Sequence, residues 1–109
     1  MDETEFARRA DATLLALAQT LEAALDADDP DIDLANGILT VGLADGRKFI
    51  VNKHMPTRQI WLSSPVSGAA HFAYDASADM WRSTRGPQIL ATQLAEDFAV
   101  AVGHPVAIG

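Results

Sequence analysis

Apolar residues recur at helical spacing at the two ends of the chain. From Thr4 to Asp26 they fall every three or four positions, which predicts an amphipathic helix. Its stripe consists of Phe6, Ala10, Leu14, Leu17, Leu21 and Leu25. Pro30 ends this pattern, because a proline disfavours helical conformation in the residue before it. A second helix is predicted from Gln88 to Val102, with Gly103 as its C-cap.

Between these helices, apolar and polar residues alternate in short segments, as in β-strands. Asn36-Gly37 and Asp45-Gly46 are hairpin signals and indicate antiparallel pairing. In the first segment, Ile32 and Leu34 are expected to face the core. The predicted strands are 31–34, 38–43, 48–53, 59–64, 70–74 and 80–84. The order predicts an α+β fold, with 1–109 as one domain. It is a two-layer sandwich in which both helices pack on one face of an antiparallel sheet of five to seven strands.

Trp61 breaks the pattern of buried aromatic residues. In the predicted strand from Gln59 to Ser64, Ile60 and Leu62 alternate with Gln59, Trp61 and Ser63. Since the helices can cover only one face, Trp61 is expected on the open face, where Asn52 and Gln59 can lie beside it. An exposed tryptophan among polar side chains is typical of a contact site. Trp81, by contrast, is expected in the core.

Charge is distributed unevenly along the 109 residues. The net charge is −7, and the first 33 residues hold ten acids against two arginines, so they carry the whole negative excess. The densest part is 22–33, with six acids and no base: Glu22, Asp26, Asp28, Asp29, Asp31 and Asp33. We call these six residues the acidic ridge. Such a surface is suited to cations or to a basic partner, although a solvated face that aids solubility has the same appearance.

The acidic ridge is also a candidate site for hard cations, which prefer carboxylate oxygens. Glu22, Asp26 and Asp29 fall on one flank of the first helix pattern, and Asp31 and Asp33 share one face of the following strand. An EF-hand is excluded, because the required glycine and terminal glutamate are replaced by Leu34 and Thr40. We therefore expect an open site that binds cations weakly and with poor selectivity.

Several other functions lack their chemistry in this sequence. There is no cysteine, so the chain itself offers neither a thiol nucleophile nor Cys ligands for an iron–sulfur cluster. No phosphate-binding glycine motif and no serine nucleophile elbow occurs, and the histidines lie far apart in sequence. The acidic balance argues against nucleic-acid binding, and no apolar run approaches a membrane span. We expect a soluble, cytoplasmic protein.

One long segment identifies a family resemblance. Residues 52–68 read NKHMPTRQIWLSSPVSG, which resembles the signature of the frataxin family, whose bacterial branch is known as CyaY. The first helix and the first predicted hairpin are also similar to those of the family, and Trp81 matches the strand tryptophan before the second helix. The resemblance extends over nearly the whole chain. It implies the frataxin α-β-α sandwich and a bacterial member.

The resemblance also implies a function. The chain would bind Fe²⁺ and Fe³⁺ weakly on the acidic ridge, as an iron chaperone, and would hold no cluster itself. It would take part in iron–sulfur cluster assembly and regulate it by docking on the cysteine desulfurase and its scaffold protein. The partner-binding residues would be Trp61, Asn52, Gln59, Asp29, Asp31 and Asp33. Departures from the family pattern are His54, where glutamine is usual, and Ala18, Gln19 and Ala23 at helix positions that are often acidic.

Two alternatives remain open at this stage. One is a ferroxidase that stores iron in oligomers, although the sequence shows no Glu-x-x-His pair for a di-iron site. The other is an acidic interaction module that has no connection with iron. We expect a monomer in the absence of iron and leave open an iron-dependent oligomer.

Overall fold

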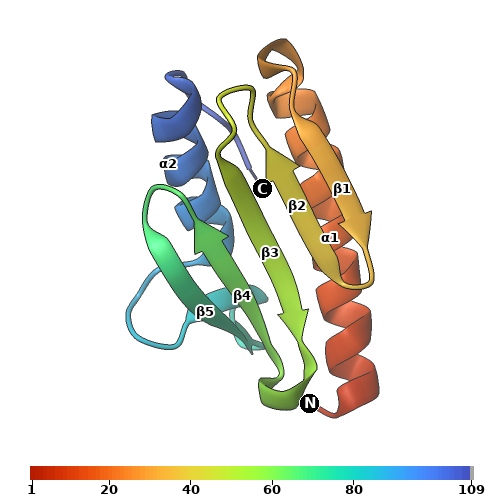
Figure 1. Ribbon diagram of the computed structural model, residues 1–109. Coiled ribbons are helices and arrows are strands. Elements are labelled where there is room, and N and C mark those ends of the chain that lie inside the picture. The colour runs from red at the N-terminus through yellow and green to blue at the C-terminus, as the bar shows by residue number, and fades with distance from the viewer. Residues whose placement is uncertain (109) are drawn as a thin grey trace.

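The computed structural model describes residues 1–108, which form two helices and a six-stranded sheet (Figure 1). The helices are α1 (Glu3–Ala24) and α2 (Leu90–Val102). The strands are β1 (Asp31–Ala35), β2 (Ile38–Gly42), β3 (Lys48–His54), β4 (Gln59–Ser64), β5 (Gly68–Asp75) and β6 (Met80–Ser83). Two single 3-10 turns, η1 (Asp26–Asp28) and η2 (Met55–Thr57), join neighbouring elements. Among the described residues, neither helix is long and apolar enough to cross a membrane.

All six strands are antiparallel, and their order in space is their order in the sequence. The turn between β1 and β2 shows how neighbouring strands come to pair in antiparallel orientation. Asn36 and Gly37 both adopt positive φ, 54° and 75°, which is the backbone of a two-residue turn that matches strand twist. Both helices lie behind the sheet in Figure 1, so the face toward the viewer is open. The predicted two-layer α+β sandwich is confirmed.

The core lies between the sheet and the two helices. The predicted stripe of α1 is buried, and α2 contributes Leu90, Leu94 and Phe98. Phe98 stacks on Phe49 of β3 with ring centroids 3.9 Å apart, and both rings are fully buried. This contact fixes α2 to the middle of the sheet.

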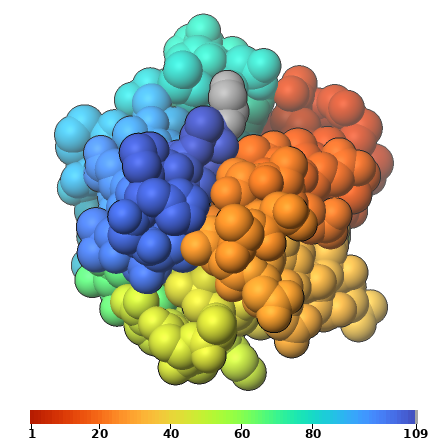
Figure 2. Space-filling view, turned by 90° about the horizontal axis from the view of Figure 1, so that it is seen from above, coloured from red at the N-terminus to blue at the C-terminus, as the bar shows by residue number. Residues whose placement is uncertain are grey.

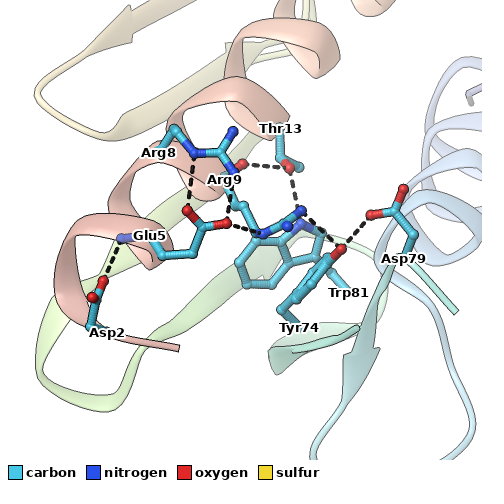
Figure 3. Close-up of polar contacts among 8 residues, drawn as sticks. All are labelled: Asp2, Glu5, Arg8, Arg9, Thr13, Tyr74, Asp79 and Trp81. Carbon is cyan, nitrogen blue, oxygen red and sulfur yellow. Dashed lines mark hydrogen bonds and ion pairs between the residues drawn. The ribbon is translucent and has the colours of Figure 1, made fainter. Parts of the chain in front are cut away.

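A polar network around Trp81 holds the N-terminal half of α1 to the sheet (Figure 3). Trp81 is buried, as predicted. The indole Nε1 of Trp81 donates to Thr13 Oγ1 at 2.9 Å. Arg9 forms an ion pair with Glu5 at 2.7 Å and donates to the Tyr74 hydroxyl at 3.0 Å. Residues of α1 are thereby joined to β5 and β6 at the sheet edge opposite β1.

Several element boundaries differ from the sequence prediction by one to two residues, and α2, for example, begins at Leu90 rather than at Gln88. The helix α1 ends at Ala24 rather than at Asp26, because the chain tightens into η1 and then reaches the left-handed region at Asp29, with φ 51°. Leu34 is on the predicted face of its strand, but it is 37% exposed rather than buried. It lies on the helix side of β1, but β1 is an edge strand with no neighbour beyond it, so Leu34 is covered from one side only.

A core substitution tests the stacked contact between α2 and the sheet. Phe98→Ala should lower the free energy of unfolding by about 3–5 kcal/mol, because it removes a fully buried ring and leaves a cavity. Val100→Ala is the matched control, since Val100 lies on the same helix and is 68% exposed. It should change stability by less than about 1 kcal/mol. Urea denaturation followed by circular dichroism measures both, and equal losses would contradict the assigned packing.

Candidate functional site

The acidic ridge runs from the last turn of α1 through η1 to the edge strand β1. Glu22, Asp26 and Asp29 are exposed and line one shallow hollow of about 320 Å³, together with Pro30 and Ile32. The structure therefore brings together the three carboxylates that helical spacing placed on one flank. The left-handed backbone of Asp29 turns the chain from η1 into β1, which keeps its side chain at this hollow.

Asp31 and Asp33 occupy a different part of the ridge. They alternate with Ile32 along β1, so their side chains lie on the open face of the sheet. Their cross-strand partners on β2 are Gly42 and Thr40. Both aspartates are exposed. The ridge thus has two parts, a hollow beside the end of α1 and a pair of carboxylates at the edge of the open face.

Asp28 does not share the exposure of the other ridge residues. Its Oδ2 lies 2.8 Å from His104 Nε2, just beyond the end of α2. Seen from above, the orange end of α1 and η1 lies against the blue end of α2 (Figure 2). The carbonyl of Pro105 and then Asp28 raise the pKa of His104 above its usual range. The carboxylate of Asp28 is therefore engaged in joining the two helix ends, whereas the sequence suggested a free ligand.

The geometry of the ridge decides what it can bind. Throughout 1–108, no three His, Asp or Glu side chains form a ready metal cage. The exposed carboxylates instead form an open anionic surface. A surface of this kind leaves most of a cation's water in place, unlike a closed cage of ligands.

The open face carries the predicted contact residues. Trp61 is half-buried at the centre of the sheet, and Asn52 of β3 is its direct cross-strand partner. The indole Nε1 of Trp61 donates to Gln59 Oε1 at 2.9 Å, which holds the ring in one orientation. Ile38 and Ile50 are 41% and 38% exposed on the same face. The structure therefore groups Trp61, Asn52 and Gln59 on one uncovered surface with an apolar surround.

Two histidines at this surface were missed by sequence reasoning. The imidazoles of His54 and His71 stack on opposite sides of the Trp61 indole, with centroid distances of 3.6 and 4.2 Å. The strand register brings them there, because His71 is opposite Trp61 on β5 and His54 is diagonal to it on β3. The predicted strand 48–53 stops before His54; extending it by one residue would have put His54 on the face of Asn52, but the register of β5 was needed to find His71. We call these three residues the ring stack.

The pair between Asp28 and His104 predicts a pH effect on stability. A raised pKa in the folded state means that the stabilisation is complete below the unfolded pKa of histidine, about 6.5, and is lost as the pH rises through the folded value. The difference in melting temperature between the wild type and His104→Gln should therefore shrink from about pH 5.5 to pH 8.5. Asp28→Asn should lower the His104 pKa measured by NMR but leave the Pro105 contribution. A difference that grows with pH would contradict this assignment.

Comparisons with known proteins agree with this architecture. The frataxin-like domain model matches residues 1–104. The chain is 38% identical to the mitochondrial frataxin homolog of Schizosaccharomyces pombe, over 97% of this chain and 69% of the relative. It is 34% identical to the iron-sulfur cluster assembly protein CyaY of Thioalkalivibrio sulfidiphilus, over 97% and 98%. A trimeric frataxin from the yeast Saccharomyces cerevisiae, complexed with ferrous iron, superposes with a TM-score of 0.75 at 33% identity, over 87% of this chain and 86% of that one. The chain therefore belongs to the frataxin family.

Proposed function

We propose that this protein binds iron weakly on the acidic ridge and regulates iron–sulfur cluster assembly by docking on the cysteine desulfurase and its scaffold protein. The observation that supports the proposal most strongly is that most carboxylates of the acidic ridge are exposed and pair with no other described residue. Five of its six carboxylates are exposed, and across residues 1–108 none of the five forms an ion pair: Glu22, Asp26, Asp29, Asp31 and Asp33. They lie beside an open sheet face that carries an aromatic contact residue.

Iron fits the donor set of the ridge. Fe²⁺ and Fe³⁺ accept carboxylate oxygens, and an exposed set of them attracts a cation without desolvating it. Glu22, Asp26 and Asp29 would gather iron at the hollow beside η1, and Asp31 with Asp33 would do so at the sheet edge. Asp28 would join only after leaving His104. This arrangement supports a chaperone that releases iron readily, with any oligomer formed only under iron load.

Docking would use the open face and the same aspartates. Trp61, Asn52 and Gln59 form the central contact, and Asp31 and Asp33 lie on the same face at its edge. Asp29 lies next to them at the end of η1. A basic surface on the desulfurase would meet these carboxylates, so iron and the desulfurase would compete for them.

The names of two relatives support the cellular role. The Thioalkalivibrio relative is named an iron-sulfur cluster assembly protein, and the yeast structure is described as a ferrous complex. We place this protein in the same process and in the bacterial cytoplasm.

A charge-matched pair of variants tests the shared surface. Asp31→Asn with Asp33→Asn removes two negative charges from the ridge, whereas Glu3→Gln with Glu96→Gln removes two exposed charges elsewhere. At low salt, the first variant should bind the cysteine desulfurase about three- to tenfold more weakly, and the control should bind nearly as the wild type does. Biolayer interferometry at increasing salt measures the affinity. Wild-type binding should weaken with salt, and the first variant should depend on salt less.

Two results would count against the proposal. Equal affinity of both variants at low salt would remove the ridge from the docking surface. Unchanged desulfurase affinity at saturating Fe²⁺, with the metal bound on the ridge, would show that iron and the partner do not share carboxylates.

A further inference from the structure

The ring stack is the most ordered feature of the open face. Three rings from three adjacent strands are stacked, with the Trp61 indole between the imidazoles of His54 and His71, and each imidazole is inclined by 11° to the indole. Each ring of the sandwich is half-buried, so every ring also presents atoms to solvent. The core of the protein lies on the helix-covered face of the sheet. The stacking of two imidazoles on Trp61 on the open face is therefore not needed to form the core.

Hydrogen bonds fix the stack in place without fixing its charge. His54 Nδ1 lies 2.8 Å from Thr57 Oγ1, and Trp61 is held by Gln59. A threonine hydroxyl both donates and accepts, so the contact with His54 persists whether or not the imidazole carries a second proton. Imidazole is the side chain that changes charge between about pH 5 and 8. The contact between His54 and Thr57 is therefore compatible with either protonation state of the imidazole.

Two arginines lie close in the fold to the two imidazoles of the stack. Arg58 follows Thr57 at the end of η2, and Arg85 lines one hollow of about 400 Å³ together with His71. Both arginines are exposed, and neither forms an ion pair with another described residue. Arg82 lies on the open face of β6, where the nearby acid Asp75 pairs with it at 3.1 Å. The unpaired positive charge thus lies near β3 to β6, whereas the edge strand β1 carries unpaired carboxylates.

We propose that the ring stack is a proton-gated docking element that receives a carboxylate-bearing segment of the partner protein and binds it more tightly when His54 and His71 are protonated. The inference rests on the proposed docking through Trp61 and adds the chemistry of the partner and its regulation. The partner is expected to be acidic, because Arg58, next to η2, and Arg85, which lines a hollow with His71, both carry positive charge that no described residue pairs.

Protonation strengthens this surface in two ways. An imidazolium lying flat on an indole is held by the negative face of the ring, so the indole is oriented more firmly for contact. The same positive charge attracts the partner's carboxylates. Among ordinary side chains, imidazole is the group that changes charge between about pH 6.0 and 7.5, so a response in this window is assigned to histidine. His104 is the one other histidine in the sequence, and it lies beside Asp28 rather than on the open face.

The first experiment needs no partner. NMR titration of the free protein from about pH 7.5 to 5.5 follows the indole Nε1–H signal of Trp61 and the imidazole signals of His54 and His71. The Trp61 signal should move with the same midpoints as the two imidazoles. In His104→Gln the movement should be unchanged, and in His54→Gln with His71→Gln it should be lost. If the chemical shift of the Trp61 indole Nε1–H does not change as the two imidazoles titrate, the proposed proton gating is wrong.

The second experiment measures affinity for the desulfurase–scaffold complex at pH 6.0 and 7.5. From pH 7.5 to pH 6.0, the affinity of the wild type should rise about three- to tenfold more than that of the double variant His54→Gln with His71→Gln. Both proteins are measured on the same partner preparation. His104→Gln is the matched control and should keep the wild-type pH response. His71→Arg carries a fixed charge and should bind at pH 7.5 nearly as tightly as the wild type does at pH 6.0, with a smaller pH response.

The outcomes separate this inference from the proposed function. If Trp61→Ala weakens binding but the double histidine variant keeps the full pH response, docking stands and proton gating is wrong. If His71→Arg binds more weakly than the wild type at pH 7.5, the proposal that the partner segment carries carboxylates is wrong. Failure of the wild type to bind the complex at either pH would overturn the docking proposal together with this inference.

Discussion

The structure depends on the burial of the sheet on one face only, because both helices pack on the same side. Two amphipathic helices bury their apolar stripes against a six-stranded sheet, and they cover one face of it only (Figure 1). The contacts of Phe6 with Trp81 and of Phe98 with Phe49 fix the two helices to the sheet. Because the burial of apolar surface is completed on that side, the other face is free of any role in the core. Its side chains are therefore available for recognition.

Charge is separated on this scaffold. Carboxylates gather where α1 ends and the edge strand β1 begins, whereas the unpaired arginines Arg58 and Arg85 follow η2 and β6. The ring stack lies on β3 to β5. The acidic ridge and the ring stack are thus connected through the hydrogen-bonded strands of one sheet. The ion pair between Asp28 and His104 keeps the acidic end tied to α2.

Much of this arrangement follows from local patterns. The period of the apolar residues predicted both helices, the hairpin turns predicted an antiparallel sheet, and the alternation around Trp61 predicted its place on the open face. These features are determined by residues close together in sequence. The assigned roles of the ridge and of the open-face residues remain predictions, because geometry shows where they lie and not what they bind.

The features that sequence reasoning missed are non-local. Asp28 and His104 are 76 residues apart, and only the packing of α2 beside η1 brings them into contact. His71 reaches Trp61 through the register of β4 with β5, which the loop between these strands determines. The exposure of Leu34 depends on β1 being an edge strand. Alternation assigns a side chain to a face, but it does not say how far a helix extends over that face.

Anaerobic NMR titration with Fe²⁺ most directly tests the division of the surface into a metal-binding ridge and a protein-binding face. Amide signals of residues 22–33 should broaden, while the indole Nε1–H signal of Trp61 persists, and diamagnetic Ca²⁺ should shift the same ridge amides without broadening them. Broadening centred on His54, Trp61 and His71, or none anywhere, would contradict the account.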